Sequence, residues 1–329
     1  MAEMKTLRWG LLSTARINRA LIPAIRASKR NRLLAVASRT EAAAAAYARE
    51  WGIERAHGSY ESLLADPEID VIYISLPNGL HAEWTIRAAR AGKHVLCEKP
   101  LAVTVDEVDR VAAAAGEAGV AVAEAFMYRH HPQTARVREL VASGALGRVR
   151  FVRGTFSFTL SRPRDVRLDP ALGGGALWDV GCYPLSFARF VLGQEPLEVT
   201  GSQHTGPTGV DLTFAAQLRF PDDVLVQFDC SFEAPFRTVM ELVGEEASLL
   251  VTEPFKPGAG ARLLLNRGDE SETIEPPAAE LYAGEVEDLA DAVLLGQAPR
   301  VGLLDSRGNV AAITSLLLSA RENRSVRVG

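Results

Sequence analysis

The segment Trp9–Asn18, WGLLSTARIN, joins a short apolar run to residues that can bind an anion. The run is typical of a strand, and the residues after it are typical of a turn that leads into a helix. A helix start presents backbone N–H groups without intrahelical partners and a partial positive charge, and together these bind phosphate. Thr14 adds a hydroxyl and Arg16 a cation. The segment predicts a phosphate-binding corner, with a plain strand-to-helix corner as the alternative.

The glycine positions of such a corner hold other residues here. A dinucleotide-binding GxGxxG turn uses glycine for a tight turn, for close approach to the pyrophosphate and for helix packing. In this chain those positions fall on Ser13, Ala15 and Asn18. A side chain at positive φ costs about 1–2 kcal/mol, which a folded domain tolerates. We expect the pyrophosphate to be bound by Ser13, Thr14, Ala15, Arg16 and Ile17.

A second phosphate-recognising pair ends the next apolar segment, at Ser38 and Arg39. At this point of a dinucleotide-binding unit an acidic residue selects a ribose 2′-hydroxyl, whereas an arginine accommodates a 2′-phosphate. Arginine binds a phosphate monoester through two parallel N–H bonds. The pair therefore favours NADP over NAD as cofactor. The alternative is a solvated arginine at the start of a loop.

The elements that must position these residues follow from the apolar pattern. Apolar runs at residues 7–12, 33–38, 71–76, 94–97 and 120–123 alternate with helical periodicity at 15–28, 41–51, 80–91 and 104–118. This alternation predicts a parallel, doubly wound sheet, because parallel neighbours need a long crossover. Thr104, with Glu107 three residues later, predicts a capping box. We expect residues 1–125 to form a Rossmann-type, NADP-binding domain.

The second part of the chain has a different pattern. A helix is expected near residues 133–143, and two more at about 284–295 and 305–320. Between them, alternating segments at 149–158, 212–220, 224–232 and 239–243 predict a mostly antiparallel sheet with one covered face. The fold class is therefore α/β, with residues 126–329 as a second domain.

Composition and charge exclude several classes of function. A net charge of −5 with interleaved signs gives no footprint for nucleic acid and no basic membrane patch. Three widely spaced cysteines do not indicate a disulfide framework or a zinc site. The first residues lack a leader pattern, and no apolar run approaches the ~20 residues of a membrane span. We expect a cytoplasmic protein that binds a small molecule.

Four further motifs carry a family resemblance: SLPNGLH (Ser75–His81), CEKPL (Cys97–Leu101), EAFMYRHHP (Glu124–Pro132) and GGGALWDVGCY (Gly173–Tyr183). In this order they resemble the glucose–fructose oxidoreductase, inositol dehydrogenase and MocA (Gfo/Idh/MocA) family over essentially the whole chain. The start WGLLSTARIN and the tyrosine of the last motif are most similar to NADP-dependent D-xylose dehydrogenases and dihydrodiol dehydrogenases. Ser13 departs from that subgroup, where glycine is common.

The resemblance implies an NADP(H)-dependent oxidoreductase that acts on a sugar, polyol or cyclic diol, with Lys99, Asp179 and Tyr183 as catalytic residues. Hydride exchange with nicotinamide requires a proton transfer at the substrate oxygen. A lone lysine base would need its pKa lowered from about 10.4 toward 7–8. A protonated Lys99 would instead bind the substrate oxygen or lower the pKa of a nearby tyrosine.

We expect a coupled pair in which the proton moves through Tyr183 and the Lys99 ammonium stabilises oxyanion character; which of the two titrates stays open. Asp179 would orient a substrate hydroxyl or Lys99. It precedes Tyr183 by four residues, which places both on one face of a helix unless Pro184 kinks it. The alternatives are a core tyrosine and a surface lysine at a strand end.

By resemblance, further cofactor contacts are expected from both parts of the chain: Leu76, Pro77, Asn78, His81, Glu98, Lys99, Arg129 and Arg167. Glu98 would reach the nicotinamide ribose, and the two arginines a phosphate or the cofactor amide. The adjacent His130 and His131 do not face one ion easily and have no evident third ligand, so no metal is expected.

Two rival functions stay open. One is an NAD-dependent glycosidase that oxidises its sugar transiently; the tyrosine at the usual histidine position and Ser38-Arg39 disfavour it. The other is a non-catalytic nucleotide-binding protein on the same fold, which the joint presence of Lys99, Asp179 and Tyr183 disfavours. The resemblance also implies that residues 126–329 form a substrate-binding and oligomerisation domain. Because similar proteins often associate through the exposed face of the second sheet, a homodimer or homotetramer is expected.

Overall fold

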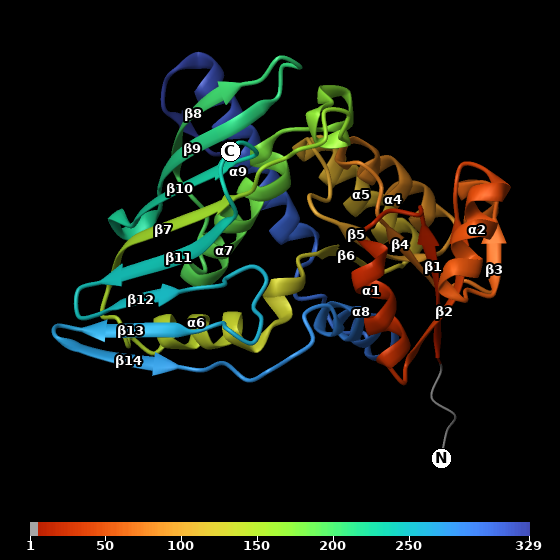
Figure 1. Ribbon diagram of the computed structural model, residues 1–329, viewed down its shortest axis with the longest axis horizontal. Coiled ribbons are helices and arrows are strands. Elements are labelled where there is room, and N and C mark those ends of the chain that lie inside the picture. Colours follow the sequence, from red (N-terminus) through yellow and green to blue (C-terminus); the bar gives the residue numbers. More distant parts are fainter. Residues whose placement is uncertain (1–5) are drawn as a thin grey trace. The chain divides into compact units, whose positions relative to one another are not determined.

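The computed structural model describes residues 6–329 and contains two compact units (Figure 1). Unit 1 holds the chain up to Met127 together with Tyr282–Arg307, and unit 2 holds Tyr128–Leu281 with Gly308–Gly329. No helix within residues 6–329 is long and apolar enough to cross a membrane. The first five residues, on which part of the leader expectation depends, lie outside the described part of the chain.

Unit 1 is built on a six-stranded parallel sheet. Its strands are β1 (Leu7–Leu12), β2 (Asn31–Ala37), β3 (Arg55–His57), β4 (Val71–Ile74), β5 (His94–Glu98) and β6 (Val122–Ala125), in the order β3-β2-β1-β4-β5-β6. β1 pairs with β2 on one side and with β4 on the other, both parallel, so the strand order reverses there. The predicted doubly wound sheet is confirmed, and its switch point follows β1, where dinucleotides bind in such folds.

Helices connect these strands: α1 (Asn18–Ala27), α2 (Glu41–Trp51), α3 (Tyr60–Leu64), α4 (His81–Arg90) and α5 (Val105–Ala118). The predicted capping box at the start of α5 is present. α1 begins three residues later than predicted, because the chain is still in a turn through Ile17. The short β3 and α3 were not predicted, since elements of three and five residues are too short for a periodic signal.

Helix α8 (Ala283–Leu295) belongs to unit 1 although it follows most of unit 2 in sequence. Its residues Val286, Leu289 and Ala290 lie in the same buried cluster as Leu21 and Ile25 of α1. The predicted division into residues 1–125 and 126–329 instead places α8 in the second domain. Helical periodicity identifies an apolar face, but it does not say which core that face joins.

Unit 2 is built on a nine-stranded sheet in the order β14-β13-β12-β11-β7-β10-β9-β8-β15. The strands are β7 (Val149–Ser157), β8 (Glu198–Thr205), β9 (Asp211–Arg219), β10 (Leu225–Ser231), β11 (Arg237–Gly244), β12 (Ser248–Val251), β13 (Leu263–Arg267), β14 (Glu270–Ile274) and β15 (Val326–Arg327). All its pairings are antiparallel except that of β7 with β10. The predicted mostly antiparallel sheet is confirmed.

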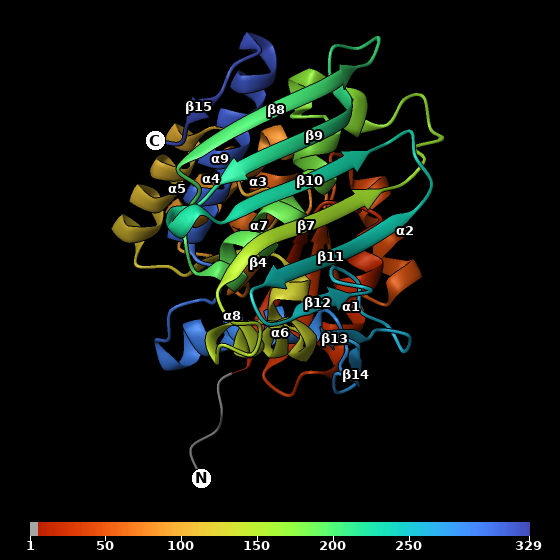
Figure 2. The same ribbon diagram turned by 90° about the vertical axis from the view of Figure 1, so that its left-hand side faces the viewer.

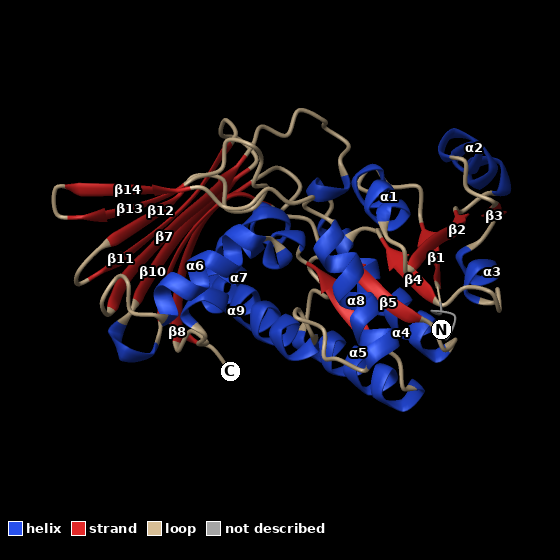
Figure 3. Ribbon diagram, turned by 90° about the horizontal axis from the view of Figure 1, so that it is seen from below, coloured by secondary structure: helices blue, strands red, loops and turns tan. Residues whose placement is uncertain are grey.

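Helices cover one face of this sheet: α6 (Pro132–Ala142), α7 (Cys182–Leu192) and the last part of α9 (Leu303–Glu322) (Figure 3). Figure 2 shows the other face, on which the described residues of unit 2 place no helix. Short helical turns complete the chain: η1 (Asn78–Leu80), η2 (Met127–His130), η3 (Val166–Leu168), η4 (Pro170–Leu172), the π-helical η5 (Leu177–Gly181) and η6 (Pro221–Asp223).

Candidate active site

The corner after β1 holds Ser13 in a backbone conformation that favours glycine, with φ at 132°. The residue is buried, at 7% exposure. The Ser13 hydroxyl lies 2.8 Å from the Ser75 hydroxyl and 3.1 Å from the Ser75 carbonyl oxygen, and it accepts the Ala15 N–H at 3.1 Å. The side chain is therefore an internal hydrogen-bonding group.

Asn18, the first residue of α1, completes this network. Its amide donates to the Ser13 carbonyl at 2.8 Å, and its side-chain oxygen accepts from the Ser75 hydroxyl at 2.8 Å. A net contribution of ~1 kcal/mol for each buried hydrogen bond is enough to offset the ~1–2 kcal/mol of backbone strain at Ser13. Three polar side chains thus stabilise a turn that glycine usually makes possible.

The corner keeps the groups that a pyrophosphate needs. The backbone N–H groups of Thr14, Arg16 and Ile17 have no hydrogen-bond partner within residues 6–329, and Ile17 provides no side-chain cap for α1. Arg16 is exposed and has no carboxylate partner in the same range. Unpaired N–H groups at a helix start, with a cation beside them, fit an anionic diphosphate.

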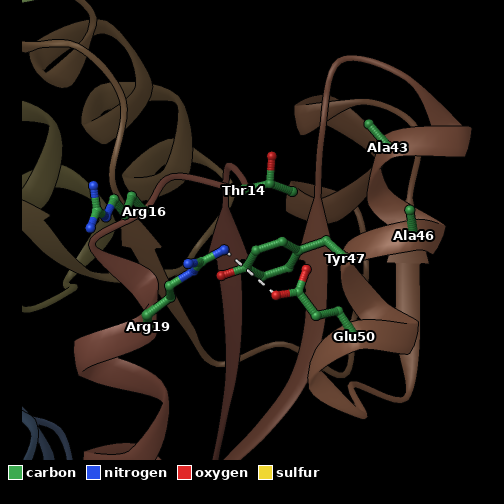
Figure 4. A pocket seen from close by; sticks show the side chains of 7 residues that line it. All are labelled: Thr14, Arg16, Arg19, Ala43, Ala46, Tyr47 and Glu50. Atoms are coloured by element: carbon green, nitrogen blue, oxygen red, sulfur yellow. Dashed lines mark ion pairs between the residues drawn. The ribbon is translucent and has the colours of Figure 1, made fainter. Parts of the chain in front are cut away.

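A cavity of about 440 Å³ lies beside this corner (Figure 4). Its lining comes from the corner itself, from the start of α1 and from α2: Thr14, Arg16, Arg19, Ala43, Ala46, Tyr47 and Glu50. Tyr47 and Glu50 reach from α2 toward Arg19, and Arg19 forms an ion pair with Glu50 at 3.6 Å. Because Glu50 neutralises Arg19, Arg16 supplies the unpaired positive charge at the cavity wall.

Ser38 and Arg39 follow β2 and come just before α2. Ser38 is buried, and its N–H donates to the His57 carbonyl at 3.1 Å. Arg39 is exposed and has no carboxylate partner within the described residues. Thr40 caps α2 by accepting the Ala43 N–H, so Arg39 stands beside a helix N-terminus. Both the arginine and the helix end favour an anion at this place.

His81 links two of the loops that follow strands. Its Nε2 lies 2.7 Å from the Leu76 carbonyl and its Nδ1 lies 2.7 Å from the Pro100 carbonyl. Burial lowers the pKa of His81, and the nearby Lys99 charge acts in the same direction. Both ring nitrogens therefore bind the protein itself, whereas the resemblance implies a cofactor contact for His81. Asn78 begins the short turn η1 that precedes α4, and Pro77 comes directly before it.

The turn that carries Lys99 is held from two sides. His81 contacts the carbonyl of Pro100, and the buried Glu124 accepts the Leu101 N–H at 2.9 Å. Lys99 itself is half-buried directly after β5. The position of its backbone is thus set by neighbouring loops. The position of Glu124 in EAFMYRHHP was visible in the sequence, but its partner across the sheet was not.

Glu98 is the last residue of β5 and accepts a hydrogen bond from the Tyr73 hydroxyl. Burial, together with the charges of Glu98 and Glu285, keeps the pKa of Tyr73 well above its usual value. Tyr73 is therefore a neutral donor to the Glu98 carboxylate. One oxygen of Glu98 is engaged within unit 1, a contact that the sequence does not reveal.

In unit 2, Asp179 lies in the π-helical turn η5 and Tyr183 in the first turn of α7. Arg167 Nε donates to Asp179 Oδ2 at 2.6 Å, and its Nη1 donates to Asp165 at 3.1 Å. The pKa of Arg167 is raised, first by the Asp179 charge. Arg167, predicted as a cofactor contact, is thus bound to two carboxylates within unit 2.

Tyr183 is 5% exposed and belongs to an aromatic cluster. Its ring centroid lies 5.8 Å from that of Tyr128, 5.2 Å from that of Phe156 and 5.4 Å from that of Phe255. Such neighbours fix the orientation of the ring. The same cluster is what a core tyrosine would show, so packing alone does not separate the two interpretations of Tyr183.

Arg129 is also engaged within unit 2. It is buried, its Nη1 donates to the Ser186 hydroxyl at 3.1 Å, and its guanidinium lies 4.0 Å from the ring centroid of Phe190. His131 accepts the Gln133 N–H at 3.1 Å and caps α6. Among residues 6–329, no three His, Cys, Asp or Glu side chains come together in a way that could hold a metal.

Two family models match the chain. Residues 7–126 match the oxidoreductase family with an NAD-binding Rossmann fold, and residues 134–250 match the GFO/IDH/MocA C-terminal domain. D-xylose 1-dehydrogenase (NADP(+)) 2 of Haloferax volcanii is 40% identical over 98% of this chain and 100% of its own length. A dTDP-3,4-didehydro-2,6-dideoxy-alpha-D-glucose 3-reductase of Streptomyces violaceoruber is 38% identical, covering 94% and 92%.

A solved structure shares the fold over nearly the full length. The 3-ketoreductase from Actinomadura kijaniata, in complex with NADP and TDP-benzene, has a TM-score of 0.91 at 32% identity, covering 96% of this chain and 98% of its own. Its lysine and tyrosine variants have also been solved. The two substituted residues are separated by the same number of positions as Lys99 and Tyr183.

Proposed function

Because the chain belongs to the Gfo/Idh/MocA oxidoreductase family, we propose that it transfers hydride between NADP(H) and a hydroxyl or carbonyl carbon of a sugar, polyol or cyclic diol. The corner after β1 carries this proposal: its N–H groups at Thr14, Arg16 and Ile17 are unpaired within the described residues, whereas the Ser13 hydroxyl is engaged by Ser75 and by the Ala15 N–H. A protein that only used this corner structurally would gain by capping those groups.

The choice of NADP rests on Arg39. Its guanidinium is exposed, has no described carboxylate partner and stands beside the start of α2. A 2′-phosphate would accept two parallel N–H bonds from it, with the Ser38 hydroxyl nearby. The relative from Haloferax volcanii is named for NADP(+), and the 3-ketoreductase was solved with NADP.

Proton transfer is assigned to Lys99 and Tyr183. Bound NADP(H) would supply the hydride donor or acceptor. Tyr183 would pass the proton to or from the substrate oxygen, and the Lys99 ammonium would stabilise negative charge there. The fixed turn of Lys99 and the packed ring of Tyr183 suit groups that must not move during the reaction. The 3-ketoreductase has been solved as a lysine variant and as a tyrosine variant, and the two substituted residues are as far apart in its sequence as Lys99 and Tyr183 are in this one.

An assay at 340 nm with NADP⁺ and NAD⁺, over a panel of sugars, polyols, inositols and dihydrodiols, tests the proposal. We expect turnover with NADP⁺ on at least one substrate. On that substrate, we expect Lys99→Ala and Tyr183→Phe each to lower kcat by about 10²–10⁴-fold, the usual size of a general acid–base contribution. Lys29→Ala, at an exposed lysine, is the matched control.

Full activity of Lys99→Ala on that substrate would disprove the catalytic assignment. Substrate cleavage with no net change at 340 nm would instead favour the NAD-dependent glycosidase. NADP binding without turnover of any panel member would favour a non-catalytic protein.

We also propose a homodimer or homotetramer that forms through the open face of the second sheet. On this face Arg153 pairs with Glu241 at 2.8 Å and Gln227 bonds to Gln217 at 3.1 Å across neighbouring strands, and the Arg153 guanidinium lies over the partly exposed ring of Phe151. Such a face of polar pairs and apolar side chains can meet its own copy across a two-fold axis. Sedimentation of the wild type and of Gln227→Trp tests this proposal, because the bulky indole ring on the open face should shift the variant to a smaller oligomer or a monomer. A monomeric wild type would contradict the proposal.

A further inference from the structure

The helical segment that carries Asp179 has no cap of its own. η5 begins at Leu177, and Ala176 before it makes no side-chain hydrogen bond to the first turn. The first N–H groups of a helical segment need acceptors when they are buried. Here Asp211, the first residue of β9, supplies them: its Oδ2 accepts the Leu177 N–H at 2.7 Å, and the Ala176 N–H also bonds to this carboxylate.

Gly175 makes this contact possible. Its φ is +125°, and a Cβ at this position would lie 2.2 Å from Asp211 Oδ1. Any side chain would therefore push the carboxylate away from the start of η5. Asp211 is 3% exposed, so it is a buried carboxylate whose hydrogen bonds run to the backbone of this segment. Burying a charge is costly in free energy unless the charge is paired or hydrogen-bonded.

We propose that Asp211 is a positioning residue, which fixes the start of η5 and so places Asp179 two residues later and Tyr183 in the next turn. This inference rests on the proposed oxidoreductase function. We expect Asp211 to touch neither substrate nor cofactor. It acts through the backbone of Ala176 and Leu177, whose displacement would move the Asp179 carboxylate relative to its partner Arg167.

The contact is expected to change with pH. Burial raises the pKa of Asp211 to about 6, while its backbone N–H partners act in the opposite direction. Protonation weakens the carboxylate as an acceptor for two N–H groups at once. The titratable group that interacts with it is the thiol of Cys230 on β10, and on β8 the opposite residue is Thr205. Burial keeps the pKa of Cys230 far above this range, and Asp179 faces Arg167.

Trp178 reports on this segment because it lies between Leu177 and Asp179. The protein contains four tryptophans, so 5-fluorotryptophan labelling gives four ¹⁹F resonances, and Trp178→Phe identifies the one of interest. We expect the Trp178 resonance of wild type to shift between pH 5 and 7 with a midpoint near 6. The shift should disappear in Asp211→Asn and persist in Asp229→Asn, a control on neighbouring β10 whose carboxylate is half exposed.

Kinetics give the second measurement. We expect Asp211→Asn to lower kcat by about 10- to 100-fold, as small misplacements of reacting groups do. The Kd for NADP should be unchanged, since the predicted cofactor corner lies in unit 1. Gly175→Ala provides a second variant with the Asp211 charge retained, and it should show the same loss of kcat.

A Trp178 resonance that does not titrate in wild type, or that titrates equally in Asp211→Asn, would overturn the inference. So would wild-type kcat in both variants. If wild type shows no NADP-dependent turnover, the proposed function fails, and the role of Asp211 in catalysis fails with it. In that case the ¹⁹F titration still decides whether Asp211 holds the segment.

Discussion

Arg167 Nε lies 2.6 Å from Asp179 Oδ2, and Nη1 of the same guanidinium lies 3.1 Å from Asp165 Oδ1. One arginine thus joins two nearly buried carboxylates within unit 2. The Asp179 carboxylate therefore already has a charged partner within unit 2. Its orientation depends on a residue twelve positions earlier in the sequence.

Replacing Arg167 should therefore lower activity, which depends on the orientation of Asp179, more than it lowers the affinity for NADP. We expect Arg167→Met to lower kcat/KM by about 10- to 100-fold, equivalent to the ~1–3 kcal/mol cost of leaving a buried charged group unpaired. Arg167→Lys should recover only part of this loss, because an ammonium cannot reproduce the two-sided guanidinium contact. Steady-state kinetics with a separate NADP titration measure both effects. A large rise in the Kd for NADP with unchanged kcat would return Arg167 to its predicted role as a cofactor contact.

The Ser13 network predicts opposite outcomes for two small substitutions. Ser13→Gly loses the side-chain hydrogen bonds but relieves the positive φ, so the free energy of unfolding should change by less than about 1 kcal/mol. Ser13→Ala loses the same bonds and keeps the strain, so it should destabilise by about 1–3 kcal/mol. Urea unfolding of both variants measures the difference. Equal stabilities would mean that the backbone at Ser13 carries no strain.

Arg39 is expected to select the cofactor. Removing one bidentate charged contact should weaken NADP binding by about 10- to 100-fold, or roughly 1.5–3 kcal/mol. Binding of NAD should stay the same, because NAD has no 2′-phosphate. Calorimetric titration of Arg39→Ala with both dinucleotides checks this, and Arg49→Ala, an exposed arginine in the last turn of α2, is the control. Unchanged NADP affinity in Arg39→Ala would contradict the NADP assignment.

Asp211 should leave a signature in the pH dependence of stability. Its pKa is 3.8 in the unfolded reference and about 6 in the folded protein. Between these values the folded state binds more protons, so the free energy of unfolding contributed by this group falls as pH rises, by about 3 kcal/mol in all. The loss is complete above pH 6. Urea unfolding from pH 4 to 7 should show this slope in wild type relative to Asp211→Asn, and parallel curves would refute it.

The packing of α8 in the core of unit 1 can be tested with a substitution that leaves a cavity there. Leu289 is fully buried in the core that contains Leu21 and Ile25. Leu289→Ala should therefore destabilise by about 2–5 kcal/mol. Hydrogen exchange locates the effect: protection should fall at β1 and α1 rather than at β7–β11. A loss confined to the second sheet would show that α8 belongs with unit 2.

The local elements and the family could both be predicted from the sequence alone. Alternating apolar runs predicted the parallel sheet, Thr104 and Glu107 predicted the capping box, and the ordered motifs identified the family. These signals are local, because a helix or strand is set by neighbours within a few residues and a motif is read in one stretch.

Which groups become partners follows from the folded structure. Ser75 supports Ser13 from the loop after β4, Arg167 binds Asp179, Asp211 caps η5 from β9, and α8 joins the first core. The three polar contacts leave no periodic trace in the sequence, since a buried polar group needs a partner at the right place in space and not at a given distance along the chain. The apolar face of α8 does leave such a trace, but the trace does not say which core the face joins. Packing brings such groups together, and only the folded chain shows which ones meet.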